Sequence, residues 1–200
     1  MNVLWTRRAD GDMLSARSRS WALQASGLRG IAAARQVHGH QVALVGEPVV
    51  GYAVSREADG LATALPGIGA AVHVADCLPV ALGGPDAVAM LHCGWRGLAG
   101  GIIAEGVRAL SALGAGGALE ARIGPGAGGC CYEAGPEVHA AFGGRASRGA
   151  NVDLKAEART QLAGAGVEQV DDIGVCTLCG GDVFSHRRGD HERMAGIAWL

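Results

Sequence analysis

Apolar and polar positions alternate along the chain in a way that predicts many short strands and few helices. The predicted strands are residues 3–7, 31–37, 41–45, 70–82, 87–91, 119–123, 167–175 and 195–199. The run 70–82 is interrupted only by Asp76, Cys77 and Pro79, so we interpret it as a buried strand that enters a functional bend. Residues 9–20 and 57–67 are rich in polar or turn-forming residues and predict loops.

The clearest helical pattern covers residues 97–113. Leu98, Ile102 and Ala109 fall on one side of a helix at this spacing, which is typical of a helix that packs on a core. Shorter helices are predicted at residues 21–26 behind a Ser20 cap, at 136–142, and at 154–163 behind Asp153.

The order of these elements predicts the fold class. Several strand-to-strand connections are too short for the crossover helix that parallel neighbours need. We therefore expect an α/β (α+β) fold, a layered single domain over residues 1–200 with mixed sheets and helices packed outside. A chain of 200 residues with 4% aromatic residues builds its core mainly from small aliphatic side chains.

Charge and hydropathy exclude several classes of partner. The formal net charge is −2, and no block of lysine or arginine predicts binding to nucleic acid or to an anionic membrane. Neither a secretory signal nor a membrane-spanning stretch is evident, so we expect a cytoplasmic protein. In that reducing compartment the six cysteines are expected to be free, metal-binding or catalytic thiols.

Three segments place a metal-binding side chain at the end of an apolar run. They are RQVHGHQV (35–42) with His38, VADCLPV (74–80) with Cys77, and LHCGWRG (91–97) with His92. Two imidazoles and one thiolate can hold a zinc ion and leave a fourth position for water or substrate. Spacing alone does not decide between this site and ordinary buried histidines.

The motifs QVHG, ADCLPV, HCGWRG, IGP…CYE and CT…FSHRR…RMA resemble those of the laccase-domain or YfiH-type family. Members of this family are described as multicopper polyphenol oxidoreductases, peptidoglycan-editing factors and purine nucleoside phosphorylases. The resemblance covers residues 31–200 and implies a layered α/β fold with one zinc ion per chain, bound by His38, Cys77 and His92. It also implies phosphorolysis of adenosine, inosine, guanosine and methylthioadenosine, with adenosine deamination as a second reaction. The expected partners are a purine nucleoside and phosphate, and the expected state is a monomer or homodimer.

Other residues near these motifs are candidates for the reaction. Beside Cys77 and His92, Asp76 is a catalytic candidate that would orient a ligand or a proton. Arg96 would grip phosphate through its fork of donors, and Asp59 would lie near the substrate. Each of these three residues could instead have a purely structural role. Arg96 would then be a surface arginine, and Asp76 and Asp59 would stabilise turns. The sequence does not decide between the functional and the structural interpretation.

The chain departs from the family pattern at three places. The N-terminal segment, about residues 1–30, is shortened and reads TRRADGD after the first strand. In the family this segment helps line the substrate pocket, so the range of substrates is open. Gly126 replaces a usual cysteine, and Cys93 stands beside His92, where a small buried residue is expected.

Two alternative functions use the same residues. A copper polyphenol oxidase (laccase) would use the two histidines and one cysteine, with His38 and His40 as a pair, although His73, His139, His186 and His191 form no further pairs. A peptidoglycan-editing hydrolase would use Cys77 as nucleophile and His92 as base.

The remaining cysteines offer a separate hypothesis. Cys176 and Cys179 form a C-x-x-C, and Cys130 and Cys131 are adjacent. Four thiolates suit a structural zinc site, although adjacent cysteines are not the usual spacing. A thioredoxin-like redox role is disfavoured, because this C-x-x-C does not open a helix after an N-terminal strand.

Overall fold

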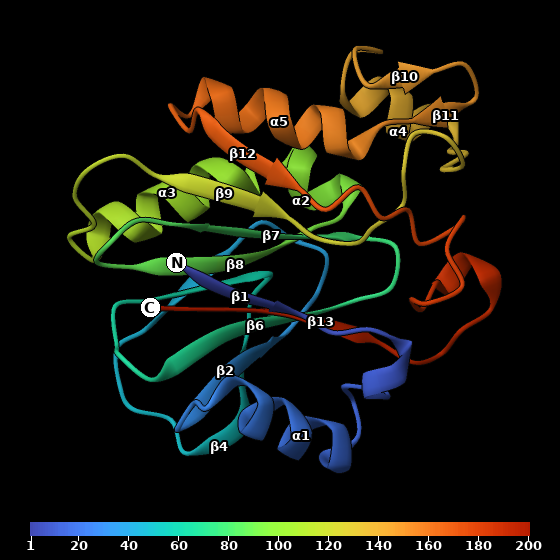
Figure 1. Cartoon of the computed structure of the whole chain (residues 1–200). Helices are drawn as coiled ribbons and strands as arrows, with labels where there is room; N and C mark the ends of the chain where they lie inside the picture. Colours follow the sequence, from blue (N-terminus) through green and yellow to red (C-terminus); the bar gives the residue numbers. More distant parts are fainter.

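Two mixed β-sheets are stacked face to face, with helices on both outer faces (Figure 1). The structure is a computed structural model that describes residues 1–200, the side chain of Ser55 excepted. The first sheet has the order β1 (Asn2–Trp5), β13 (Met194–Trp199), β6 (Ile68–Val74), β2 (Gly30–Arg35), β4 (Gly51–Glu57). The second has the order β12 (Gln169–Asp172), β9 (Glu120–Ile123), β7 (Leu78–Gly83), β8 (Val88–Cys93), β5 (Gly60–Thr63), β3 (Val42–Val45).

Both sheets combine parallel and antiparallel pairs. In the first sheet β2 is parallel to β4 and β6, whereas β13 is antiparallel to β6 and β1. In the second sheet β3–β5 and β9–β12 are parallel and the remaining pairs are antiparallel. The predicted α/β fold with mixed sheets is therefore confirmed.

The helices cover the two outer faces of the stack. The helices are α1 (Ala16–Ser26), α2 (Trp95–Ala99), α3 (Ile102–Ala112), α4 (Pro136–Ala141) and α5 (Leu154–Gly164). Short 3-10 turns lie at Arg8–Asp10 and His186–Arg188, and a small hairpin joins β10 (Ser147–Arg148) to β11 (Asn151–Val152). None of the helices in the described part of the chain has the length and apolar character required to span a bilayer.

The core forms three apolar layers. Val72, Met90 and their neighbours fill the space between the sheets. Ala22 of α1 packs with Ile197 on the outer face of the first sheet, while α3 and α5 cover the second sheet, with Leu110 in its core. The central strands are thus covered on both faces, which explains their continuous apolar runs in place of strict alternation.

Two helix predictions differ from the structure, one at its start and the other by an internal break. Helix α1 begins at Ala16 rather than at residue 21, because Ser15 caps it by accepting the backbone N–H of Ser18 at 3.2 Å. The pattern over residues 97–113 divides into α2 and α3, since Gly101 adopts φ +85° at the break.

The chain changes from one sheet to the other at two places that the strand predictions did not identify. The run 70–82 divides at Asp76–Cys77, after which the chain passes from β6 in the first sheet to β7 in the second. Strands β2 and β3, on either side of His38, also belong to different sheets. The sequence pattern missed β4 and assigned β5 to a turn-rich loop. Because β2 and β6 are parallel neighbours, both crossings leave the first sheet at the same edge.

Candidate metal centre and its pocket

His38, Cys77 and His92 meet at the edge where the chain crosses between the sheets. One side-chain donor atom of each lies within 4.8 Å of the others. The rings of His38 and His92 are 5.0 Å apart at 74°. His38 and Cys77 follow the carboxyl ends of the parallel strands β2 and β6, and His92 in β8 pairs with Pro79 near the start of β7. The topology therefore brings together three residues that are distant in the sequence.

A buried carboxylate orients the two histidines. Nδ1 of His92 donates to Oδ1 of Asp59 at 2.8 Å, which leaves Nε2 of His92 free for a metal. Asp59 is 0% exposed and also accepts the backbone N–H groups of His38 at 2.9 Å and Gly39 at 2.7 Å. A carboxylate behind a ligating histidine is the usual support of a metal centre. Two ring nitrogens, one sulfur and this support fit a three-ligand zinc site.

The charges at this centre favour metal binding by Cys77. Burial opposes ionisation of Cys77, but hydrogen bonds with His38 and His92 outweigh it and lower the thiol pKa to about 6. Burial also opposes protonation of His92, yet the hydrogen bond with Asp59, followed by the one with Cys77, raises its pKa to about 9. Cys77 is therefore a thiolate at neutral pH, which is the form that binds metals.

The backbone around the centre is constrained. His38 (φ 60°) and Asp76 (φ 90°) are the non-glycine residues with positive φ among those described, and both lie at the centre. The carboxylate of Asp76 accepts the hydroxyl of Thr177 at 2.6 Å and the backbone N–H of Arg187 at 2.8 Å. These bonds hold the turn that presents Cys77, and such strain persists only where the surroundings enforce it.

A cationic pocket opens onto the centre. The cavity measures about 570 Å³, within the range of small-molecule sites. Five arginines line it: Arg19, Arg35, Arg96, Arg187 and Arg193. The one acidic residue in the described lining is Asp76, whose carboxylate is already occupied by Thr177 and Arg187. The pocket therefore suits an anionic ligand.

Aromatic and apolar side chains form the rest of the wall. Leu14, Val54, Trp95 and Tyr132 all face the cavity. The guanidinium carbon of Arg96 lies 4.4 Å from the ring centroid of Trp95, and the corresponding distance from Arg187 to Tyr132 is 4.9 Å. Such cation–π contacts hold the arginines against the wall.

Some of the predicted site residues line the cavity, and others lie outside it. Arg96 and Asp76 line the cavity together with the three metal-ligand candidates. Asp59 lies behind His92 with no exposed surface, so its position does not support contact with substrate and instead makes it a positioning residue. His40 is exposed and does not join the metal-binding group.

Cys93, the neighbour of His92, is fully buried in the core beneath the helices. Burial raises the pKa of its thiol far above the usual range. Its position agrees with the expected role as a small apolar residue.

Several residues of the pocket were not predicted from the sequence. Arg187 and His186 belong to the FSHRR segment, which carries part of the family resemblance but no predicted role for these two residues. His73 also faces the cavity; its ring accepts a 2.8 Å contact from Tyr52, and burial, followed by repulsion from Arg19, lowers its pKa to about 4. A histidine inside an otherwise apolar strand was the available signal for this residue.

Fold and site together define an α/β protein with a His–Cys–His centre that faces a cationic pocket. The family model described as multi-copper polyphenol oxidoreductase laccase matches residues 4–200. The chain therefore belongs to this family.

Curated relatives are 36–38% identical to the chain over the aligned residues. It is 38% identical to purine nucleoside phosphorylase ORF3 of Streptomyces griseus over 177 residues, which cover 82% of this chain and 72% of the relative. It is 36% identical to a purine nucleoside phosphorylase of Xylella fastidiosa over 211 residues, which cover 96% of this chain and 80% of the relative.

Solved structures of the same family share the fold. A Neisseria meningitidis protein of the DUF152 family superposes with a TM-score of 0.78 at 31% identity, covering 92% of this chain and 80% of that protein. The hypothetical protein YfiH of Bacillus licheniformis gives a TM-score of 0.82 at 26% identity, with coverage of 92% and 80%.

Proposed function

We propose that this protein is a zinc-dependent purine nucleoside phosphorylase. It would cleave adenosine, inosine, guanosine and methylthioadenosine with phosphate, releasing the base and a pentose 1-phosphate, and would deaminate adenosine as a second reaction. The observation that carries the proposal is the arginine-lined pocket that opens on His38, Cys77 and His92. Relatives at 36–38% identity are named purine nucleoside phosphorylases, which supports the same class of reaction.

The arginines of the pocket would bind the phosphate. Arg96 is exposed into the pocket, and Arg187 uses one guanidinium nitrogen to donate to the carbonyl of Glu133 at 2.8 Å, which leaves its other donors free. A guanidinium binds phosphate through two parallel hydrogen bonds. The five arginines of the lining outnumber its single carboxylate, that of Asp76, so the net charge of the lining favours an incoming anion.

The nucleoside part of the substrate would lie against the apolar wall. Tyr132, Trp95, Leu14 and Val54 would supply the apolar surface for the purine and the sugar, beside the two arginines that contact the aromatic rings. Enclosing the sugar between this wall and the arginines would limit the access of water and favour attack by phosphate.

His38, Cys77 and His92 would hold the zinc ion, with Asp59 fixing the orientation of His92. A zinc ion bound there supplies a Lewis acid that polarises a nearby substrate atom. Cys77 contributes the thiolate and His92 the Nε2 atom.

The family description also names copper polyphenol oxidation. Within the described residues, the groups of three or more candidate ligands are the His–Cys–His centre and a set of four cysteines. A multi-copper centre needs several histidine pairs, and neither group provides them. We therefore expect a single zinc ion, and no copper cluster, at the His–Cys–His centre, and the ratio of zinc to copper in protein purified without added metal tests this choice.

A second candidate function rests on the charges of Cys77 and His92. A thiolate beside an imidazolium is also the arrangement of a cysteine nucleophile and its acid–base partner. A peptidoglycan-editing hydrolase would use Cys77 in this way. Replacement of Cys77 by serine separates the two: loss of both zinc and activity supports the ligand role, whereas loss of activity with zinc retained supports the nucleophile.

The decisive experiment is a phosphate-dependent nucleoside assay on zinc-replete protein. Inosine and phosphate should give hypoxanthine and ribose 1-phosphate in equal amounts, and no base should be released without phosphate. Cys77→Ser should be inactive, and Arg148→Ala, an exposed change outside the pocket, should match the parent protein. Absence of base release from every purine nucleoside would refute the proposal.

A further inference from the structure

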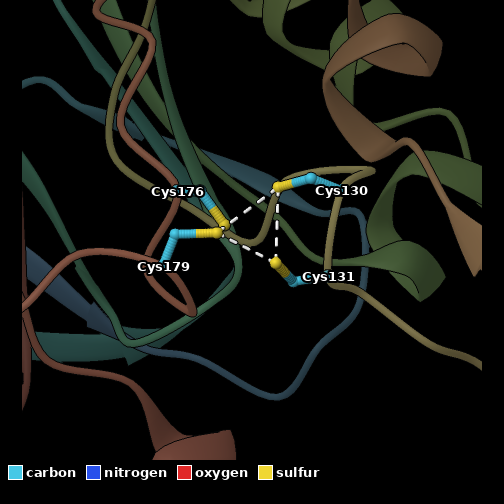
Figure 2. Close-up of side chains that lie close together, drawn as sticks. All are labelled: Cys130, Cys131, Cys176 and Cys179. Atoms are coloured by element: carbon cyan, nitrogen blue, oxygen red, sulfur yellow. Dashed lines mark hydrogen bonds between the residues drawn. The ribbon is translucent and has the colours of Figure 1, made fainter.

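A second sulfur cluster lies outside the centre described above. Cys130 and Cys131 follow β9, whereas Cys176 and Cys179 follow β12, and their sulfur atoms lie within 4.8 Å of one another. Figure 2 shows the four side chains pointing toward a common point from two separate loops. All four cysteines are free. The parallel pairing of β9 and β12 brings these two loops to the same edge of the second sheet.

The spacing of the sulfur atoms is close to that of a tetrahedral metal site. Four sulfurs at a zinc–sulfur distance of about 2.3 Å would be about 3.8 Å apart. Cys130 Sγ lies 3.5 Å from both Cys131 Sγ and Cys179 Sγ, and Cys131 Sγ lies 2.9 Å from Cys179 Sγ. These separations exceed a disulfide bond of about 2.05 Å. Of these three pairs, Cys131 and Cys179 would have to move apart the most to reach the tetrahedral spacing.

Backbone contacts fix the cluster in place. Gly128 donates its N–H to Cys176 Sγ at 3.3 Å, and a Cβ atom at Gly128 would approach the Cys130 sulfur to 3.2 Å. Gly126 forms a parallel bridge with Cys176, so the two loops are joined directly beneath the sulfurs. The N–H of Cys131 donates to the carbonyl of Gly128 at 3.0 Å, closing the turn that brings the adjacent cysteines together.

The exposure of the cluster argues against a packing role. Cys130, Cys131 and Cys179 are exposed, and Cys176 is half-buried. Exposed thiols gain little from hydrophobic burial and are prone to oxidation. Arg188 donates to the carbonyl of Gly180, the residue that follows Cys179.

We propose that Cys130, Cys131, Cys176 and Cys179 bind one zinc ion in a four-thiolate site that ties the loop after β9 to the loop after β12. Zinc binding would replace the four thiol protons, which pass to solvent, and no electrons are transferred. The site is separate from the His38–Cys77–His92 centre and does not depend on the reaction proposed there. It would hold in place Tyr132, next to Cys131, at the pocket wall.

Zinc counts in single and double variants test the site. With both centres filled, the parent protein should contain two zinc ions per chain, and Cys77→Ser should contain one. The double variant Cys130→Ser/Cys179→Ser should also contain one, held by His38, Cys77 and His92. Glu133→Gln, an exposed change in the same loop, should keep the zinc content of the parent protein.

The two proposals fail differently in this experiment. If the double variant keeps all the zinc of the parent protein, the four-thiolate site is refuted. If Cys77→Ser keeps all of it while the double variant loses one ion, the four-thiolate site stands and the His–Cys–His centre does not. Circular dichroism of each variant identifies loss of metal through unfolding.

A spectroscopic measurement does not require the double variant to fold. Cobalt-substituted Cys77→Ser protein should show the intense sulfur-to-cobalt charge-transfer band of a tetrahedral four-thiolate site. Removal of zinc from this variant should also lower its thermal midpoint, because metal bound to the folded state alone adds to stability. An absent band, a native Cys131–Cys179 disulfide found by mass spectrometry, or iron in place of zinc would each overturn the proposal.

Discussion

The Nδ1 atom of His92 donates to Oδ1 of Asp59 at 2.8 Å, and both side chains are buried. Asp59 also accepts the N–H of His38, so a single carboxylate positions two of the three candidate ligands. This carboxylate therefore links the segment that carries His38 to the strand that carries His92. Asp59 therefore supports the candidate metal centre although it is not one of the candidate ligands.

Replacement of Asp59 by asparagine should weaken zinc binding at the His–Cys–His centre by about 10- to 100-fold. This is the usual effect of removing a carboxylate that is hydrogen-bonded to a ligating histidine. An amide can still accept one backbone N–H but does not enforce the tautomer of His92. Competition with a chromogenic chelator measures this affinity. Asp86→Asn, the same change at an exposed position, should bind zinc like the parent protein, and equal affinities in both variants would contradict the role of Asp59.

Zinc binding at this centre should depend on pH in two steps. Between about pH 6 and 9, His92 must lose a proton to bind, since its pKa is raised to about 9, so affinity should rise about tenfold per pH unit. Below about pH 6 Cys77 is protonated as well, because its pKa is lowered to about 6, and the dependence should steepen.

Calorimetry of the Cys130→Ser/Cys179→Ser variant in buffers of different ionisation enthalpy counts these protons at the His–Cys–His centre alone. About one proton should be released per zinc at pH 7.5. Release of two protons would show that Cys77 is still a thiol at that pH.

Loss of either pocket arginine should impair phosphorolysis without removing the metal. A hydrogen bond to a charged group contributes about 1.5–3 kcal/mol, so Arg96→Ala or Arg187→Ala should lower kcat/KM for phosphate by about 10- to 100-fold. The zinc content should not change, because neither residue belongs to the ligand group. Steady-state kinetics with varied phosphate tests this, and Arg148→Ala is the matched control. Unchanged kinetics in both pocket variants would place the phosphate elsewhere.

Gly94→Ala should displace Cys77 by steric contact alone. The added Cβ atom would lie 3.0 Å from Cys77 Sγ, while the backbone at φ −73° accepts alanine without strain. We expect reduced zinc affinity with a small change in thermal stability. Gly46→Ala has open space around it and serves as the control. A parent-like zinc affinity in Gly94→Ala would show that Cys77 can move without cost.

Much of the local structure follows from the sequence. The buried runs at β6, β7 and β8 predicted strands correctly, and Asp153 caps α5 by accepting the N–H of Ala156 as expected. These features depend on neighbouring residues, and local pattern is sufficient to predict them. Helix α1 was placed too late because Ser15 and Ser20 are equivalent caps in the sequence, and only the packing of Ala22 and Met13 selects the earlier start.

The sequence by itself determined the ligand types, the short strands and a centre near QVHG, ADCLPV and HCGWRG, because residue chemistry and local periodicity are written there. Tertiary structure decided which strands share a sheet, and with it the arginines that meet in the pocket, the carboxylate behind His92, and the gathering of four cysteines from two loops. Such contacts join residues far apart in the chain, and their formation depends on how strands pair and sheets pack, which no local pattern specifies.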